Sequence, residues 1–153
     1  MRIEGAFTVP AALPAVWDAI LDPAVVGPCI PGCGEIEVLS PTEYRATVRV
    51  SVGPIGTSFN LVVTVKESVL HERVASVTRG EEGSRASLLT AHNLLTLRAA
   101  GDGTEVAYAS DVSLSGRLGK FGLGLMRKKA SDTAAAFAAN LAARLTRPLE
   151  DVR

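Results

Sequence analysis

Between residues 35 and 115 the chain alternates apolar and polar positions with the period of two that is typical of half-buried strands. Runs of this kind cover residues 44–52, 58–65, 72–78, 86–98 and 105–114, and a further run covers residues 1–9. Glycine and proline interrupt the alternation at 53–56 and 100–103, where they predict hairpin turns. The polar segment 79–84 is predicted to be another turn. The pattern therefore favours an antiparallel sheet of about six to seven strands.

Two short helices are expected after the first strand. Pro10 and Pro14 bracket a helix start, and residues 13–21 place Trp17 on an apolar helical face. Asp22 then ends this helix and can cap a second helical turn that reaches Val26. Residues 27–34 contain two prolines and three glycines, so we expect an irregular loop there.

A long C-terminal helix is predicted for residues from about 118 to 146, with about 28 residues and a length of about 42 Å. Its apolar side carries Leu118, Leu125, Phe137, Leu141 and Leu145, with Ala130, Ala134 and Ala138 between them. Alanines fill less space than leucines would, so we expect this helix to close the mouth of a curved sheet and leave a cavity. The alternative is an alanine-rich amphipathic helix that packs directly on the sheet.

The expected fold class is α+β, because one face of an antiparallel sheet needs a cover and only the last helix is long enough to provide it. We predict a helix-grip fold: a curved antiparallel sheet of about six to seven strands around a long C-terminal helix, with two short helices after the first strand. The length of 153 residues fits a single domain, residues 1–153.

Charge and composition limit the possible partners. Lys plus Arg and Asp plus Glu number 16 each, so nothing indicates a nucleic-acid partner. The sequence has no stretch of about 18 consecutive apolar residues, and the N-terminus has no cleavable apolar run, so we expect a cytoplasmic protein without a signal peptide. Cys29 and Cys33 lack metal-ligand spacing, and we interpret them as reduced thiols rather than as a metal or redox site.

Catalytic chemistry is not indicated by the titratable residues. His71 lies in a predicted polar turn and is expected to be solvated, and His92 is a lone strand histidine with a structural role as its simplest explanation. The sequence shows no nucleophilic triad and no phosphate-binding loop. Gly119, Gly122 and Gly124 lack the strand-to-loop context of a dinucleotide fingerprint. We therefore predict no catalytic residues, no metal and no covalent cofactor.

A binding protein needs only an apolar cavity, a few polar groups and an entrance. The predicted cavity residues are Trp17, Ile30, Val50, Phe59, Leu61, Val63, Tyr108, Val112, Phe121, Leu125, Met126, Phe137 and Leu141. The alternative is that these side chains simply pack together. If the Tyr108 hydroxyl is buried, it needs a hydrogen-bond partner, which can be a ligand carbonyl or an internal backbone group.

The entrance is expected between the loop at 28–34 and the glycine-rich segment 116–126. Each glycine inside a helix costs about 1 kcal/mol relative to alanine, which loosens this end of the helix. The predicted gate and membrane-contact residues are Pro31, Gly32, Arg117, Lys120, Arg127, Lys128 and Lys129. The cationic members can contact anionic lipid headgroups at about 1 kcal/mol each, and the alternative is a solvated helix face.

Several short sequence phrases occur in a characteristic order. They are Gly5 with Phe7-Thr8-Val9-Pro10, Val16-Trp17, Asp22-Pro23, Cys29-Ile30-Pro31-Gly32-Cys33, Val52-Gly53-Pro54-Ile55-Gly56, Phe59, Gly103-Thr104 and Gly116-Arg117-Leu118. In this order they resemble the family of the CoxG subunit of carbon monoxide dehydrogenase, within the START-like, birch-pollen-allergen-like superfamily (SRPBCC). The resemblance spans nearly the whole chain.

The resemblance implies an accessory role beside a molybdenum hydroxylase of the carbon monoxide dehydrogenase type and recruitment of that enzyme to the membrane. The superfamily holds apolar ligands in the cavity of the helix grip. We therefore expect a non-catalytic protein that binds a quinone or other isoprenoid lipid at the inner face of the cytoplasmic membrane. One alternative is a polyketide cyclase-like enzyme with His92 and Tyr108 as acid and base. The other is a pure interaction or maturation factor that acts through its Ile30-Pro31-Gly32 loop.

Overall fold

The computed structural model describes residues 1–120 and 123–145. In this part of the chain, seven strands form one antiparallel sheet in the order β1-β7-β6-β5-β4-β3-β2. The strands are β1 (Arg2–Val9), β2 (Cys33–Ser40), β3 (Glu43–Val52), β4 (Ile55–Val69), β5 (Arg73–Glu82), β6 (Ser87–Ala100) and β7 (Gly103–Gly116). The helices are α1 (Leu13–Ile20), α2 (Pro23–Cys29) and α3 (Leu123–Leu145), with 3₁₀ turns η1 (Gly83–Arg85) and η2 (Leu118–Lys120). The predicted helix-grip architecture is confirmed.

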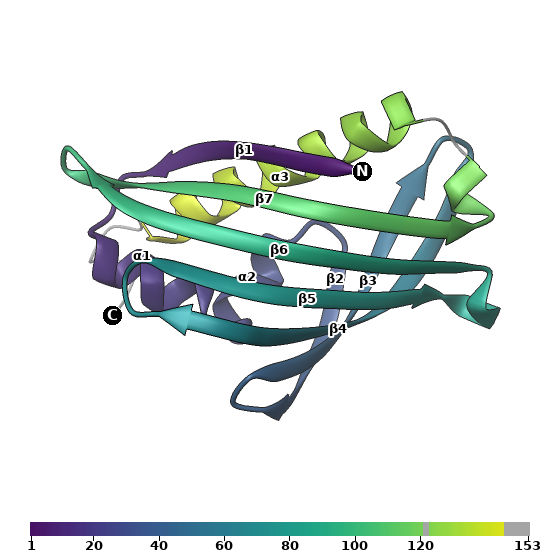
Figure 1. The fold of residues 1–153 in the computed structure, drawn as a ribbon, viewed down its shortest axis with the longest axis horizontal. Coiled ribbons are helices and arrows are strands. Elements are labelled where there is room, and N and C mark those ends of the chain that lie inside the picture. Colours follow the sequence, from purple (N-terminus) through teal and green to yellow (C-terminus); the bar gives the residue numbers. More distant parts are fainter. Residues whose placement is uncertain (121–122, 146–153) are drawn as a thin grey trace.

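The helices lie on one side of the sheet, and β2 and β3 run steeply across the direction of β5 to β7 (Figure 1). The backbone of α3 comes closest to β1, to α2 and to β3. The strand β1 lies at one edge of the sheet and β3 lies next to the other edge, whereas β5 and β6 lie in its middle. The helix therefore rests on the sheet edges and spans the concave face between them.

The strand register decides which side chains face α3. Phe7 pairs with Val106, which pairs with Leu97, and all three belong to the apolar core or pack against it. Every second residue from these positions faces the helix, and the residues between them face outward. The sheet therefore has one inner face, toward the helices, and one outer face, toward solvent.

The buried apolar residues fall into two separate clusters. The first cluster joins α1, α2 and the end of α3 to the sheet; its fully buried members include Val16, Val106 and Leu141. The second cluster lies at the other end of the sheet, around Phe59 and Leu118. The middle of the inner face belongs to neither cluster, and this gap positions the candidate site.

Two local predictions were wrong because long-range contacts outweigh the local pattern. The helix α2 continues to Cys29, with Pro28 in its last turn, and β2 begins at Cys33, so the irregular loop is reduced to residues 30–32. The buried Gly27 permits this packing, since a side chain there would collide with Ile36 on β2. The strand β5 runs to Glu82, through most of the segment 79–84 that was predicted to be a turn.

The long C-terminal helix is confirmed over Leu123–Leu145. Its first predicted residues differ, because Leu118–Lys120 form a 3₁₀ turn and not the first turn of an α-helix. The left-handed backbone of Gly116, with φ of 88°, redirects the chain there, and a side chain at this position would collide with the Ala86 carbonyl. Residues 121–122 and 146 of the prediction lie outside the described residues.

Candidate ligand-binding site

Four polar side chains cross the middle of the inner face in a row. Ser76 on β5 pairs in register with Asn93 on β6, which pairs with Ser110 on β7. The Asn93 amide donates to Ser76 Oγ at 3.3 Å and to Thr78 Oγ1 at 3.1 Å, and Ser110 Oγ donates to Asn93 Oδ1 at 2.7 Å. We call Ser76, Thr78, Asn93 and Ser110 the polar row.

The polar row remains partly exposed although it lies on the inner face of three interior strands. A helix packed directly on these strands would bury such side chains, as Leu141 and Val106 are buried in the first cluster. The middle of the inner face is therefore only partly covered, and we refer to the uncovered region between the polar row and α3 as the space. The two apolar clusters lie on either side of the polar row.

The opposite wall of the space is the small-residue part of α3. Ala130, Thr133 and Ala134 are half-buried and lie on the helix face that also carries Phe137 and Leu141. Phe137 packs against the first cluster and Met126 against the second, so the small residues lie between the two clusters. Short side chains here keep the helix from filling the space above the polar row.

Aromatic rings line the β1 side of the space. The ring of Tyr108 lies 6.3 Å from that of Phe7, which lies 6.4 Å from the ring of Phe137 on α3. The Tyr108 hydroxyl makes no hydrogen bond to any described residue. It is therefore free to bond a ligand or water.

A hollow of about 390 Å³ opens at the seam between β1 and α3. It is lined by Arg2, Ile3, Glu4, Arg127 and Ser131. Ile3 faces inward and pairs in register with Ser110, the last member of the polar row. The hollow therefore lies beside the polar row at the edge of the sheet, at a different place from the predicted gate.

The predicted cavity residues lie in three groups. Trp17, Phe137 and Leu141 belong to or pack against the first cluster, and Val50, Phe59, Leu61 and Met126 belong to or pack against the second. Val63, Tyr108 and Val112 face inward between the clusters and are half-buried. Ile30 is half-buried where α2 ends, and Leu125 is 39% exposed. Phe121 lies outside the described residues.

The predicted gate residues do not form one group. Pro31 and Gly32 are exposed, but the Gly32 carbonyl accepts a hydrogen bond from the Arg49 amide at 2.9 Å, which ties this loop to β3. Arg127 donates to the Arg2 carbonyl at 2.9 Å. Lys128 pairs with Asp132 at 2.9 Å, whereas Lys120 and Lys129 form no ion pair with a described residue.

Arg117 takes part in a buried network at the start of the C-terminal segment. Its guanidinium binds the carboxylate of Glu82, which is only 1% exposed and also accepts a hydrogen bond from Ser87 Oγ at 2.9 Å. Ser87 Oγ in turn accepts the Leu118 amide at 3.0 Å. Hydrogen bonds from Arg117, and then from Thr57, lower the pKa of Glu82 to about 2. The network fixes η2 to the end of β5, a structural role for Arg117 that the sequence did not indicate.

Comparison with known proteins identifies the family of this chain. The sequence matches the model of the family described as the CoxG subunit of carbon monoxide dehydrogenase over residues 5–146. The chain belongs to the CoxG family. No curated protein matches this CoxG-family chain.

Solved structures resemble this CoxG-family chain in fold at low sequence identity. A conserved protein from Geobacillus kaustophilus has a TM-score of 0.87 at 16% identity, with 95% of each chain covered. A START superfamily protein from Mycobacterium smegmatis has a TM-score of 0.74 at 14% identity, with 99% of each chain covered. The Zhui aromatase/cyclase from Streptomyces sp. R1128 has a TM-score of 0.71 at 12% identity, with 100% of this chain and 96% of that chain covered. These likenesses show a START-like fold.

The histidines of the CoxG-family chain do not face the space above the polar row. His92 is exposed on the outer face of β6, in register with Val77 and Asp111. The alternative of a cyclase that uses His92 and Tyr108 together is therefore wrong, since only Tyr108 faces inward. His71 was predicted to be solvated, but it is half-buried with its ring edge-on to Trp17 at 6.0 Å.

The two cysteines lie at the end of α2 and at the start of β2. Cys29 is buried and Cys33 half-buried, both are free thiols, and burial raises the pKa of each. Among residues 1–120 and 123–145, no group of three or more His, Cys, Asp or Glu side chains is placed to hold a metal ion. None of the helices in the described part of the chain is long and apolar enough to cross a bilayer.

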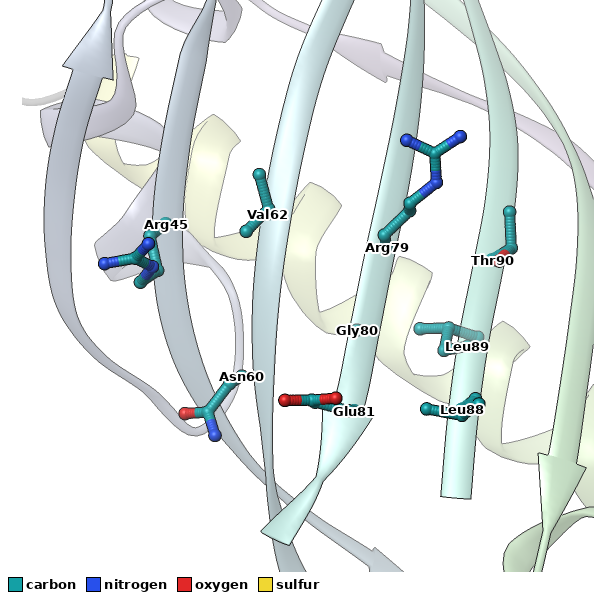
Figure 2. A pocket seen from close by; sticks show the side chains of 9 residues that line it. All are labelled: Arg45, Asn60, Val62, Arg79, Gly80, Glu81, Leu88, Leu89 and Thr90. Atoms are coloured by element: carbon teal, nitrogen blue, oxygen red, sulfur yellow. The ribbon is translucent and has the colours of Figure 1, made fainter. Parts of the chain in front are cut away.

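A second hollow, of about 430 Å³, lies on the outer face of the sheet. Figure 2 shows Arg45, Val62 and Arg79 on this face, with α3 behind the strands. The hollow crosses β3 to β6, and none of the polar-row residues lines it. It is a shallow depression between exposed side chains of the convex surface.

Sequence reasoning did not identify the polar row. Its signal is a polar residue in the apolar phase of a strand: Asn93 shares its face with Ala91 and Leu95, and Ser110 shares its face with Tyr108 and Val112. On β6 this phase is hard to read, since Leu88 and Leu94 on the outer face are also apolar and are each 40% exposed. The register with β7 resolves the ambiguity.

Proposed function

We propose that this CoxG-family protein is a non-catalytic accessory protein that binds an apolar ligand between the middle of the sheet and α3. One observation carries the proposal: the core is divided into two clusters, and the inner face between them is partly exposed. A fold selected only for stability would fill this position with large side chains from α3, but the helix carries alanines and a threonine there.

The chemistry of the walls supports an uncharged, mostly apolar ligand. The space is bounded by apolar clusters, by the aromatic rings of Phe7 and Tyr108, and by a few polar groups on the sheet. This combination of apolar walls with a small number of placed polar groups is typical of small-molecule sites. An isoprenoid quinone or a related lipid has a matching long apolar body and a small polar head.

Membership of the CoxG family supports a role beside a molybdenum hydroxylase of the carbon monoxide dehydrogenase type. In this role the protein takes its ligand from the inner face of the cytoplasmic membrane and presents it to that enzyme, or brings the enzyme to the membrane. A closed apolar site would let such a ligand leave the bilayer without exposure to water.

The ligand can be tested by native mass spectrometry of protein purified without detergent, followed by organic extraction and identification of the bound molecule. We expect an isoprenoid quinone or lipid at near-stoichiometric amounts. A clean apo mass, together with no uptake of an added quinone, would contradict ligand binding and favour a pure interaction protein.

The partner can be tested separately by co-elution of the protein with a purified carbon monoxide dehydrogenase-type hydroxylase in size-exclusion chromatography. We expect the two proteins, when mixed, to elute together and earlier than either protein alone. Ligand uptake without any such complex would leave the ligand-binding role intact and remove the proposed partner.

A further inference from the structure

The polar row carries more polar hydrogens than its own hydrogen bonds use. Ser76, Thr78, Asn93 and Ser110 carry five polar hydrogens, because each hydroxyl supplies one and the amide supplies two. The three hydrogen bonds within the row use three of these hydrogens. The hydroxyl hydrogens of Ser76 and Thr78 remain, and no described residue accepts them.

This surplus does not depend on the orientation of the Asn93 amide. With the amide turned by 180°, Asn93 would accept from Ser76 and Thr78 and donate to Ser110, and one N–H and one O–H would be left over. In both orientations two donors of the row have no acceptor among the described residues. The row is therefore suited to a group that accepts hydrogen bonds.

The neighbours of the row on the sheet offer no counter-charge to an ionised ligand group. On the inner face the row is flanked by Val63 and Val65 on β4 and by Ala91 and Leu95 on β6. None of the four row residues is charged, so an ionised head would lose its hydration without gaining a counter-charge. An uncharged acceptor such as a carbonyl oxygen fits the two donors without this cost.

We infer that Ser76, Thr78, Asn93 and Ser110 recognise an uncharged carbonyl group on the apolar ligand and orient its head at the middle of the sheet. This inference rests on the proposed function, because it needs a ligand in the space below α3. The carbonyl can belong to a quinone or to a lipid ester, and both present the same acceptor to the row.

The test compares probes with and without carbonyl groups. Diphenylhexatriene is a fluorescent hydrocarbon, decylubiquinone carries quinone carbonyls, and monoolein carries an ester carbonyl. The affinity of each is measured for the wild-type protein and for Thr78→Val and Asn93→Leu, which keep side-chain size while removing donors. Thr96→Val, at an exposed outward position on β6, is the matched control.

We expect Thr78→Val to lower the affinity for a carbonyl probe about 3- to 10-fold, as the loss of one neutral hydrogen bond predicts. The affinity for diphenylhexatriene should stay unchanged. Asn93→Leu should have at least this effect, because it also removes the group that orders the hydroxyls, and Thr96→Val should have none. If the row variants lower the affinity for only one of the two carbonyl probes, that probe shows whether the carbonyl belongs to a quinone or to an ester.

Two results would overturn the inference and are distinguishable. Equal effects of both row variants on hydrocarbon and carbonyl probes, with wild-type binding intact, would mean that the row does not select the carbonyl while the proposed function stands. Absence of binding of all three probes to the wild-type protein would remove the proposed function and this inference with it. If Asn93→Leu does not fold, Thr78→Val alone decides between the outcomes.

Discussion

The ring of Tyr108 lies against the bare backbone of Gly5, its register partner on the edge strand β1. A Cβ atom at Gly5 would lie 2.5 Å from the Tyr108 hydroxyl oxygen, so only glycine leaves room for the ring. The pairing turns Tyr108 toward the edge strand and away from the middle of the inner face. It therefore helps to keep the space above the polar row open.

Gly5→Ala should destabilise the protein by about 1–3 kcal/mol, because the new methyl group must displace the Tyr108 ring from a packed position. The measurement is chemical denaturation of the purified variant. Gly56→Ala is the matched control, since a Cβ atom there meets nothing within 4 Å, and it should change stability little. If Tyr108→Ala does not offset the cost of Gly5→Ala in a double mutant, the contact is not its cause.

Glu82→Gln should lower Tm at neutral pH by about 5 °C or more, because the carboxylate that binds Arg117 is buried. The folded-state pKa of Glu82, about 2, lies below its ordinary value of 4.5. Its ionised form therefore stabilises the fold above about pH 4.5, and this contribution is lost as the pH falls toward 2. The Tm difference between wild type and variant should shrink over this range.

The control for this prediction is Glu37→Gln, which removes an exposed ion pair with Arg45 and should change Tm little at any pH. A Tm difference for Glu82→Gln that stays constant from pH 7 to pH 2 would show that titration of Glu82 is not coupled to folding.

Lys120→Gln combined with Lys129→Gln should weaken binding to vesicles of anionic lipid by about 30-fold, at about 1 kcal/mol for each cation removed. These two lysines form no ion pair with a described residue, whereas Lys128 is paired with Asp132. Lys66→Gln, at an exposed position on β4, serves as the control in vesicle co-sedimentation. Equal losses for the control and the double variant would contradict a specific membrane contact.

Ala134→Leu should leave stability unchanged or raise it, because the larger side chain enters the space beside the polar row. The same substitution at Ala19, inside the closed first cluster, should cost about 1–3 kcal/mol through overpacking. Thermal denaturation of both variants measures the difference. A similar loss of stability for the two would mean that α3 packs directly on the sheet.

The strand order and the covering helix follow from local patterns, because period-two alternation and glycine or proline turns are encoded within a few residues of each other. The prediction failed where a distant residue decides the outcome. Glu82 reads as part of a polar turn, yet Arg117, 35 residues later in the sequence, binds its carboxylate and keeps it in the strand. His71 likewise reads as solvated until Trp17 is placed beside it.

The candidate site was predictable only in outline. The alanines of the last helix predict a space beneath it, and the inner face there is partly exposed. Tyr108 was expected to face inward, and it does. The polar row could not be found, since it exists only when Ser76, Asn93 and Ser110 are aligned by the register of three strands. Arg117 was assigned to the gate because its charge is visible in the sequence, while its buried partner is not.

The most direct test of the central claim is calorimetric titration of decylubiquinone into the wild-type protein and Ala134→Leu, with the exposed Ala135→Leu as control. Our account predicts saturable binding of one molecule per chain, a loss of about ten-fold or more in affinity for Ala134→Leu, and wild-type affinity for Ala135→Leu. Wild-type affinity in Ala134→Leu, or no saturable binding to the wild-type protein, would contradict a ligand site between α3 and the sheet.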